Sequence, residues 1–354
     1  MSEARTLFDD GGVRVRAVDG HGSDVVVVTF APWQRQQNVA AEGFGETFLA
    51  SSGIDAIHVT CARNDWYQAE AMAAVIPTIT AALEGQSRRR VGYGSSMGGF
   101  AALTFSAALG LDSVIALSPQ YSVDRALVSF ETRWAEDLEA LRWRYPMTAG
   151  PGERATWNLL YDPFSADARH VDLIRALRPV TEFRLPFSGH PSGDFLKQTR
   201  LLSKMVLTLL RNDAEPARFR PAVRCRRRRS AAYWRQLARV LAGRQNLPAA
   251  MRALTQAVTL APGHLDYRYA QGQLAMKLRD YTMAVGSFEA AVAGSPTTAQ
   301  YYYNLARALR AAGKPEPALE AVRQAILLNP REEYSGLLQR LVRDNGERGS
   351  ASAS

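Results

Sequence analysis

The stretch RVGYGSSMGGFAALT, residues Arg90–Thr104, places an apolar run, a group of small residues and a helix-forming run directly after one another. Its middle, GSSMG, fits the pattern G-x-S-x-G with Ser96 at the centre. The pattern alone has low specificity, and a tight turn without chemistry also fits it. Its position between a strand-like and a helix-like run is that of a nucleophile elbow, where glycines let the strand and helix approach the serine closely. We therefore expect a sharp turn that exposes Ser96 at a helix N-terminus, where the helix dipole favours developing negative charge.

The segments around the elbow repeat the order strand, helix, strand up to about residue 212. Their apolar runs are continuous in Val, Ile and Leu, which is typical of strands covered on both faces. Strands that alternate with helices predict an α/β fold with a mostly parallel sheet and helices on both faces, and ligands bind such sheets at the carboxyl ends of the strands. One helix is expected over 123–141. The strand-like runs are residues 24–31, 54–61, 90–94, 113–118, 155–161 and 180–186.

A nucleophile elbow requires a histidine and a carboxylate elsewhere in the chain, because serine is a weak nucleophile at neutral pH unless these two groups activate it. His190 follows the last strand-like run in the loop FSGHPSGDF and is the candidate base. Two aspartates follow the preceding strand. Asp162 stands at the strand tip, held extended by the next proline, whereas Asp167 lies a few residues later and has an alternative role as a helix N-cap. The usual spacing between strand and acid favours Asp167 slightly, and both stay candidates.

The order serine, acid, histidine resembles that of the α/β-hydrolase superfamily, and the resemblance extends over the first 212 residues. It implies that Ser96 is the nucleophile and His190 the general base. It implies that Asp162 or Asp167 is the acid that orients the histidine.

The same resemblance implies an oxyanion hole made of two backbone N–H groups. One is the N–H of Met97, which follows the nucleophile. The second comes from the loop after an early strand, here FAPW, and because Pro32 has no N–H we assign it to Ala31. The His-Gly pair that is usual after this strand is absent, which leaves the shape of the hole open.

Such a site implies acyl transfer through a covalent acyl-enzyme, with no metal and no organic cofactor. The expected substrate is an ester of a small molecule or a glycan, and water is the expected acceptor. Two alternatives stay open: an acyltransferase that passes the acyl group to another alcohol, and an interaction scaffold whose hydrolase-like domain is inactive. The two cysteines, Cys61 and Cys225, are far apart and lack the spacing of a zinc site.

After residue 230 the pattern is helical only, and it repeats every 34 residues. It resembles the tetratricopeptide repeat, in which each helix pair buries its surface only against its neighbours. Residues 231–332 hold three copies, and residues 333–343 are expected to form a capping helix. The resemblance implies that the repeats bind a protein partner. The positions that set the period are Pro262, Pro296 and Pro330; Ala250, Ala284 and Ala318; and Ala257, Ala291 and Ala325.

The net charge of +9 is concentrated in one short segment, since seven arginines and no acid lie from Arg218 to Arg229. Such a run can contact nucleic acid or an anionic membrane, but a basic run bounded by proline is more often a solvated linker, which is our interpretation. The expected domains are a catalytic domain over 1–215, an arginine-rich linker over 216–230, repeats with a capping helix over 231–345, and a disordered tail over 346–354.

The composition is that of a globular protein. The chain has 354 residues, of which 47% are hydrophobic and 22% charged, enough for one large domain and a smaller one. It has no apolar run of membrane-spanning length, and its polar N-terminus lacks a secretory signal pattern. We therefore expect a cytoplasmic protein.

Overall fold

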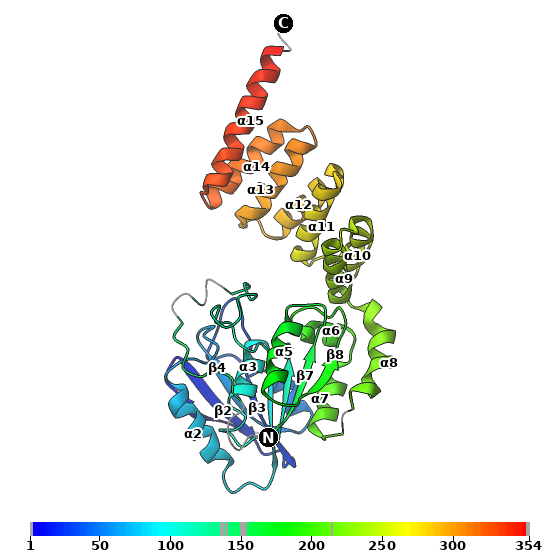
Figure 1. The fold of residues 1–354 in the computed structure, drawn as a ribbon. Coiled ribbons are helices and arrows are strands. Elements are labelled where there is room, and N and C mark those ends of the chain that lie inside the picture. The colour runs from blue at the N-terminus through cyan, green and yellow to red at the C-terminus, as the bar shows by residue number, and fades with distance from the viewer. Residues whose placement is uncertain (1–2, 135–137, 139–140, 149–153, 214, 352–354) are drawn as a thin grey trace. The chain divides into compact units, whose positions relative to one another are not determined.

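The computed structural model describes residues 3–134, 138, 141–148, 154–213 and 215–351. The chain consists of two compact units, Met1–Arg227 and Arg228–Ser354 (Figure 1). Within the described part of the chain, no helix combines the length and the apolar character that a bilayer crossing requires.

The first unit is built on one mixed sheet of eight strands, in the order β1-β2-β4-β3-β5-β6-β7-β8. The six apolar runs of the sequence form β3 to β8, and all neighbours among these six pair in parallel. The strands are β1 Glu3–Asp9, β2 Val13–Asp19, β3 Val25–Phe30, β4 Asp55–Cys61, β5 Arg89–Ser95, β6 Ser113–Leu117, β7 Thr156–Tyr161 and β8 Thr181–Arg184.

Strands β1 and β2 form an antiparallel edge that is not predicted from the sequence. β2 reads VRVRAVD, so apolar and charged residues alternate in it. Its apolar side chains Val13, Val15 and Ala17 are buried in the main apolar cluster. Arg16, on the opposite face, forms an ion pair with Glu46 in a helix. The strand is therefore amphipathic, unlike the continuous runs by which the central strands are recognised.

Helices cover both faces of the sheet. α2, α3 and α5 contribute to the cluster that holds Val26, Val28 and Phe30 of β3. α1 lies on the other face, because Arg16 reaches it from the side opposite to that cluster. The helices of this unit are α1 Glu46–Ser51, α2 Met72–Leu83, α3 Met97–Thr104, α5 Asp167–Leu177, α6 Ser192–Gln198, α7 Leu202–Leu210 and α8 Pro216–Arg226.

The helix predicted over 123–141 is wrong for residues 123–134, which form turns and irregular backbone. Residue 138 is helical and residue 141 is irregular, while 135–137 and 139–140 lie outside the described residues. The segment nevertheless contributes buried side chains, since Val123, Val128 and Trp134 are each less than a tenth exposed. Its apolar residues therefore pack against the unit without the regular hydrogen bonds of a helix.

Most of the segment for which the sequence predicts a linker is α8, where Pro216 stands in the first turn. Phe219 and Val223 are buried on one side of this helix, and the Phe219 ring lies 6.1 Å from that of Phe183 in β8. The helix therefore packs on the edge of the sheet and displays its arginines to solvent, which differs from the solvated chain expected for 216–230. The boundary between the two units follows at Arg227.

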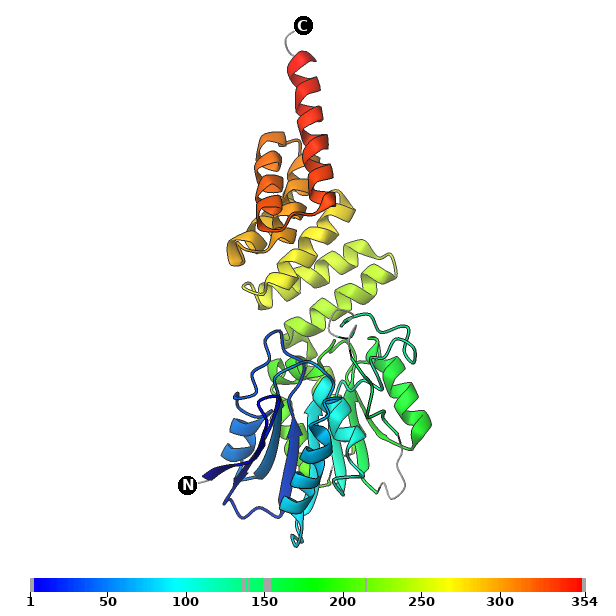
Figure 2. The ribbon, with the colours of Figure 1, turned by 90° about the vertical axis from the view of Figure 1, so that its left-hand side faces the viewer.

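The second unit is a stack of helix pairs, seen one after another in Figure 2. The alanines at the predicted 34-residue period are fully buried at the helix crossings, as the repeat pattern requires. The last helix continues to Ala351, so residues 346–351 are helical where the sequence predicts a disordered tail. The helices are α9 Ala231–Gly243, α10 Leu247–Leu260, α11 Leu265–Leu278, α12 Tyr281–Gly294, α13 Ala299–Ala311, α14 Pro315–Leu328 and α15 Glu332–Ala351.

His58 is a titratable side chain in the centre of the sheet. It lies in β4, is 1% exposed, and its Nδ1 is 2.6 Å from the hydroxyl of Thr29. Burial, with a further contribution from the charge of Arg16, lowers the pKa of His58 to about 4. The folded protein therefore holds this imidazole neutral at pH values where the unfolded chain protonates it.

This shift predicts an acid-dependent loss of stability. The pKa of His58 is lower in the folded protein than in the unfolded chain, so the unfolded chain takes up a proton first as the pH falls. The stability of the folded protein is therefore unaffected by His58 above the unfolded pKa of about 6.5, and it falls as the pH drops from there toward about 4. Between pH 7 and pH 5 we expect the free energy of unfolding to fall by about 2 kcal/mol from this group, measured by urea denaturation. His58→Asn should flatten that slope. An equal fall in both proteins would contradict the assignment.

Candidate active site

Ser96 occupies a strained turn between β5 and α3. Its backbone has φ 53° and ψ −118°, a conformation that non-glycine residues rarely adopt. The Ser96 N–H donates to the Leu117 carbonyl of β6, which fixes the turn against the sheet. A Cβ at Gly94 would lie 2.2 Å from the Gly98 oxygen, and one at Gly98 would lie 2.1 Å from the Phe30 oxygen. Both flanking glycines are therefore required for the strand and the helix to meet at this serine.

The structure brings Ser96, His190 and Asp167 together at the carboxyl ends of the strands. The Ser96 Oγ lies 3.0 Å from Nε2 of His190, which stands in the loop between β8 and α6. Nδ1 of His190 lies 3.0 Å from each carboxylate oxygen of Asp167, the first residue of α5. The imidazole thus bridges a hydroxyl and a carboxylate, the arrangement of a nucleophile, a base and an orienting acid.

Asp167 is fully buried and held as a carboxylate. Burial by itself would raise its pKa, but the charge and hydrogen bond of His190, together with the guanidinium of Arg133, hold the pKa of Asp167 below its ordinary value. The Arg133 Nη2 lies 3.2 Å from an Asp167 oxygen. Asp167 therefore stays charged at neutral pH and favours the histidine tautomer that carries its proton on Nδ1.

Asp162, the other candidate acid, is also fully buried but does not face the imidazole. Its carboxylate accepts backbone N–H bonds from Phe164, Phe187 and Gly189, each 2.9 Å long. Burial raises the pKa of Asp162, and these three bonds oppose that shift. Two of the donors belong to the loop that carries His190, so Asp162 holds this loop in place while Asp167 contacts the imidazole.

The two predicted oxyanion donors differ in the structure. Met97 is the first residue of α3, and the first amide groups of a helix have no acceptor within it, so its N–H can stabilise an oxyanion next to Ser96. The Ala31 N–H instead donates to the Val59 carbonyl at 3.0 Å, which extends the pairing of β3 with β4 by one residue. The assignment of Ala31 is therefore corrected, because its donor is used by the sheet.

Several polar and aromatic side chains around Ser96, His190 and Asp167 have no role predicted from the sequence. Gln120, fully buried just after β6, donates from Nε2 to the Ser96 Oγ at 3.1 Å. It lies at the carboxyl end of a strand, which is the one signal that could have identified it. The ring of Trp134 lies 5.5 Å from that of His190. Trp134 comes from the irregular segment after β6, where no sequence pattern indicates which side chains turn inward.

An ionic chain continues behind the acid. The Arg133 guanidinium contacts both Asp167 and Glu131, and the Glu131 carboxylate lies 3.0 Å from Nε2 of His170. The Tyr121 N–H donates to the other ring nitrogen of His170 at 3.2 Å. These groups tie the segment after β6 to α5, and so fix the position of the acid.

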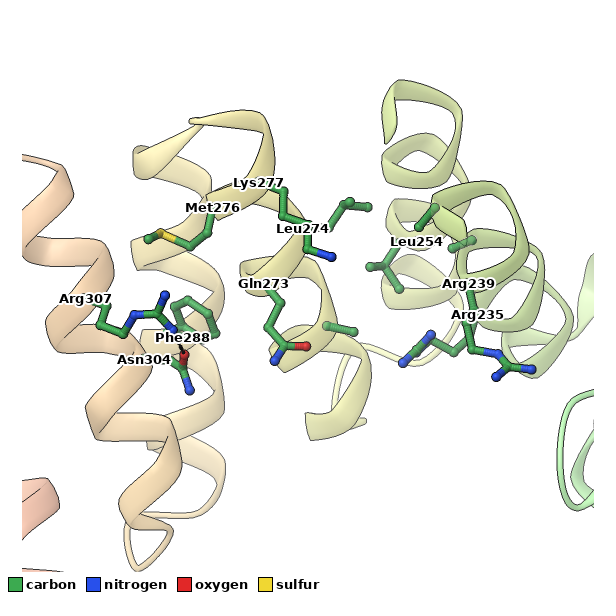
Figure 3. Close-up of a pocket in the computed structure, with 13 residues that line it drawn as sticks. Arg235, Arg239, Leu254, Gln273, Leu274, Met276, Lys277, Phe288, Asn304 and Arg307 are labelled. Atoms are coloured by element: carbon green, nitrogen blue, oxygen red, sulfur yellow. Dashed lines mark hydrogen bonds between the residues drawn. The ribbon is translucent and has the colours of Figure 1, made fainter. Parts of the chain in front are cut away.

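The second unit contains a groove of about 460 Å³ on its helical stack (Figure 3). Arg235 and Arg239 of α9 lie at one end, Lys277 of α11 in the middle and Arg307 of α13 at the other end. Apolar side chains of α10, α11 and α12 lie between these cations, and no aspartate or glutamate lines the groove. Burial lowers the pKa of Arg235, and the neighbouring charge of Arg239 lowers it further. The groove is therefore a concave cationic surface.

Comparisons with known proteins bear on this second unit. No curated protein matches the chain. Among solved structures, MamA from Desulfovibrio magneticus is 26% identical, with 45% of this chain and 91% of that chain covered and a TM-score of 0.34. The Sgt2 TPR domain from Aspergillus fumigatus is 18% identical over 34% and 82% of the two chains, with a TM-score of 0.32. The first TPR domain of human RPAP3 is 16% identical over 34% and 95%, with a TM-score of 0.32. The family model described as tetratricopeptide repeat matches residues 269–334, and the C-terminal region of the chain therefore contains a tetratricopeptide repeat domain.

Proposed function

We propose that the first unit is a serine hydrolase that cleaves carboxylic esters through an acyl-enzyme. The observation that carries this proposal is the hydrogen-bonded line from the Ser96 Oγ through the imidazole of His190 to the buried carboxylate of Asp167. The strained elbow at Ser96 supports it as well, because such strain persists where the surrounding structure and the function require it. The order serine, acid, histidine, by which the sequence resembles the α/β-hydrolase superfamily, also supports the proposal.

The chemistry follows from the roles of the three side chains. Nε2 of His190 accepts the hydroxyl proton as the Ser96 Oγ attacks the ester carbonyl, and Asp167 stabilises the imidazolium that forms. The Met97 N–H faces the developing oxyanion at the start of α3, where the helix dipole adds to its effect. The protonated imidazole gives its proton to the leaving alcohol. Water, activated by the same imidazole, then releases the acid and restores the free serine.

The test of this proposal is covalent labelling with a fluorophosphonate probe. We expect one adduct in the folded protein, located at Ser96 by peptide mapping, and none after thermal unfolding. Turnover of p-nitrophenyl esters of graded acyl length would then identify the preferred acyl group. A folded protein that neither reacts with the probe nor cleaves any of these esters would sink the proposal, and only the interaction domain would remain.

We infer that the tetratricopeptide repeat domain recruits a protein through the cationic groove, and that the partner segment is acidic. The cations of α9, α11 and α13 are spread along the groove from one end to the other, and no carboxylate of the described residues forms an ion pair with Arg235, Lys277 or Arg307. Leu254, Leu274 and Phe288 offer apolar surface between them. An extended segment with acidic residues and a few apolar side chains complements this surface.

Neutralising the groove predicts a loss of binding. For the double variant Arg235→Gln, Arg307→Gln we expect at least about a tenfold weaker affinity for a fluorescein-labelled, Asp- and Glu-rich peptide, since each charge-assisted hydrogen bond is worth about 1.5–3 kcal/mol. Fluorescence anisotropy at rising salt measures both the affinity and its electrostatic share. Arg323→Gln, an exposed cation on α14 outside the groove, is the matched control and should change nothing. Equal binding of a peptide with Asn and Gln in place of the acids would contradict the inference.

A further inference from the structure

The first unit has a second concave site, formed by the loop after β7, the end of β8 and the helix α8. Its volume is about 550 Å³, within the range of small-molecule sites. Pro163, Phe164, Pro186 and Val223 form an apolar floor. Phe164 is 42% exposed and its ring stacks on that of Phe187 at 4.4 Å, so a large aromatic surface is offered to solvent. The triad does not use this site.

Arginines surround the apolar floor. Arg184 comes from β8, and Arg220 and Arg224 come from successive turns of α8. No aspartate or glutamate lines the site, and two acids close to it in the chain have other partners: Asp162 accepts backbone N–H groups, and Glu182 contacts Tyr161 and Arg175. With Arg227, which directly follows α8, four arginines therefore border one apolar groove whose lining contains no carboxylate.

The site has a fixed shape without a ligand. The Asp162 carboxylate accepts the backbone N–H groups of Phe164 and Phe187, which holds the stacked pair in place. On the opposite side, the buried side chains of Phe219 and Val223 fix α8 against the sheet. A groove that needs no rearrangement loses little of its binding energy to ordering its own residues.

We propose that this groove binds a single-chain anionic amphiphile, with the hydrocarbon chain on the Phe164 floor and a carboxylate on the arginines. An apolar floor with a cationic border matches a ligand that has one charged end and one apolar body. The concave form favours one free molecule over a membrane surface, because Phe164 is the only large exposed apolar side chain here among the described residues. Guanidinium groups bind carboxylates with paired hydrogen bonds, so the arginines bind the charged end of the ligand.

The test uses the full chain and sodium dodecanoate below its critical micelle concentration, with affinity measured by isothermal titration calorimetry. We expect binding that the double variant Arg220→Gln, Arg224→Gln weakens at least tenfold, and that Phe164→Ala also weakens. Arg218→Gln is the matched control, because Arg218 lies on the same helix but does not line the groove, and it should leave the affinity unchanged. Dodecanoate could also bind near Ser96 as a reaction product, but the substitutions in the groove would not change its affinity there. The change in affinity caused by these substitutions therefore does not depend on the proposed esterase activity.

Three results would overturn the proposal. The first is a double variant that binds dodecanoate as tightly as the unchanged protein. The second is equal affinity for dodecanol, which would show that the arginines contribute nothing. The third is co-sedimentation with anionic phospholipid vesicles that depends on Arg220 and Arg224 while monomeric dodecanoate does not bind, which would assign the groove to a membrane surface.

Discussion

Replacing Ser96 with alanine is expected to lower kcat/KM for p-nitrophenyl esters by about 10⁴-fold or more, since loss of the nucleophile removes the acyl-enzyme route altogether. The alanine side chain occupies the same elbow, and the serine hydroxyl contacts only His190 and Gln120 among the described residues. The melting temperature should therefore change by no more than a few degrees. Steady-state kinetics and thermal denaturation of the same preparations measure both quantities.

Ser95 provides the matched control for this experiment. It precedes Ser96 in the chain and is equally buried, but it stands at the end of β5 instead of in the elbow. Ser95→Ala should keep the fluorophosphonate adduct at Ser96 and most of the turnover. Equal losses in the two variants would mean that the hydroxyl at the elbow is not the nucleophile, and the proposed mechanism would fail with it.

The elements that follow from a local sequence pattern can be predicted from the sequence, whereas those that depend on contacts between distant residues cannot. The central strands are predictable because burial on both faces demands continuous apolar runs, and the repeats are predictable because their packing recurs every 34 residues. β2 escapes notice because it is apolar on one face only, and β1 because it has few apolar residues. Residues 123–134 contain enough apolar side chains for a helix, yet they pack irregularly because their partners are distant in the chain.

The candidate site shows the same division. The elbow follows from local backbone demands, so Ser96 and its glycines are visible in the sequence. The sequence does not decide between Asp162 and Asp167, because both follow the same strand. Only the direction of each side chain distinguishes them. The wrong assignment of Ala31 has a similar cause, since the register of β3 against β4 decides whether its N–H is used by the sheet.

The two aspartates also give the second large effect that we expect. Asp167→Asn should lower kcat by about 10⁴-fold at neutral pH, whereas Asp162→Asn should lower it far less. In Asp167→Asn an amide NH₂ replaces an oxygen 3.0 Å from Nδ1 of His190, and it favours the tautomer that carries its proton on Nε2. An imidazole with its proton on Nε2 cannot accept the proton of Ser96. Kinetics at saturating ester concentration measure this loss.

Asp162→Asn distinguishes a structural role from a catalytic one. Asp162 binds the backbone of the loop that carries His190, whereas the imidazole itself contacts Asp167. The NH₂ group of the Asp162→Asn variant would face the Gly189 N–H, placing two donors where the structure has a donor and an acceptor 2.9 Å apart. We expect this variant to lose about 1–3 kcal/mol of unfolding free energy, measured in urea, while it retains most of its turnover at low temperature. Were Asp162→Asn the slower enzyme of the two and Asp167→Asn nearly normal, the acid would have to be reassigned, and the contact between Asp167 and His190 would be structural only.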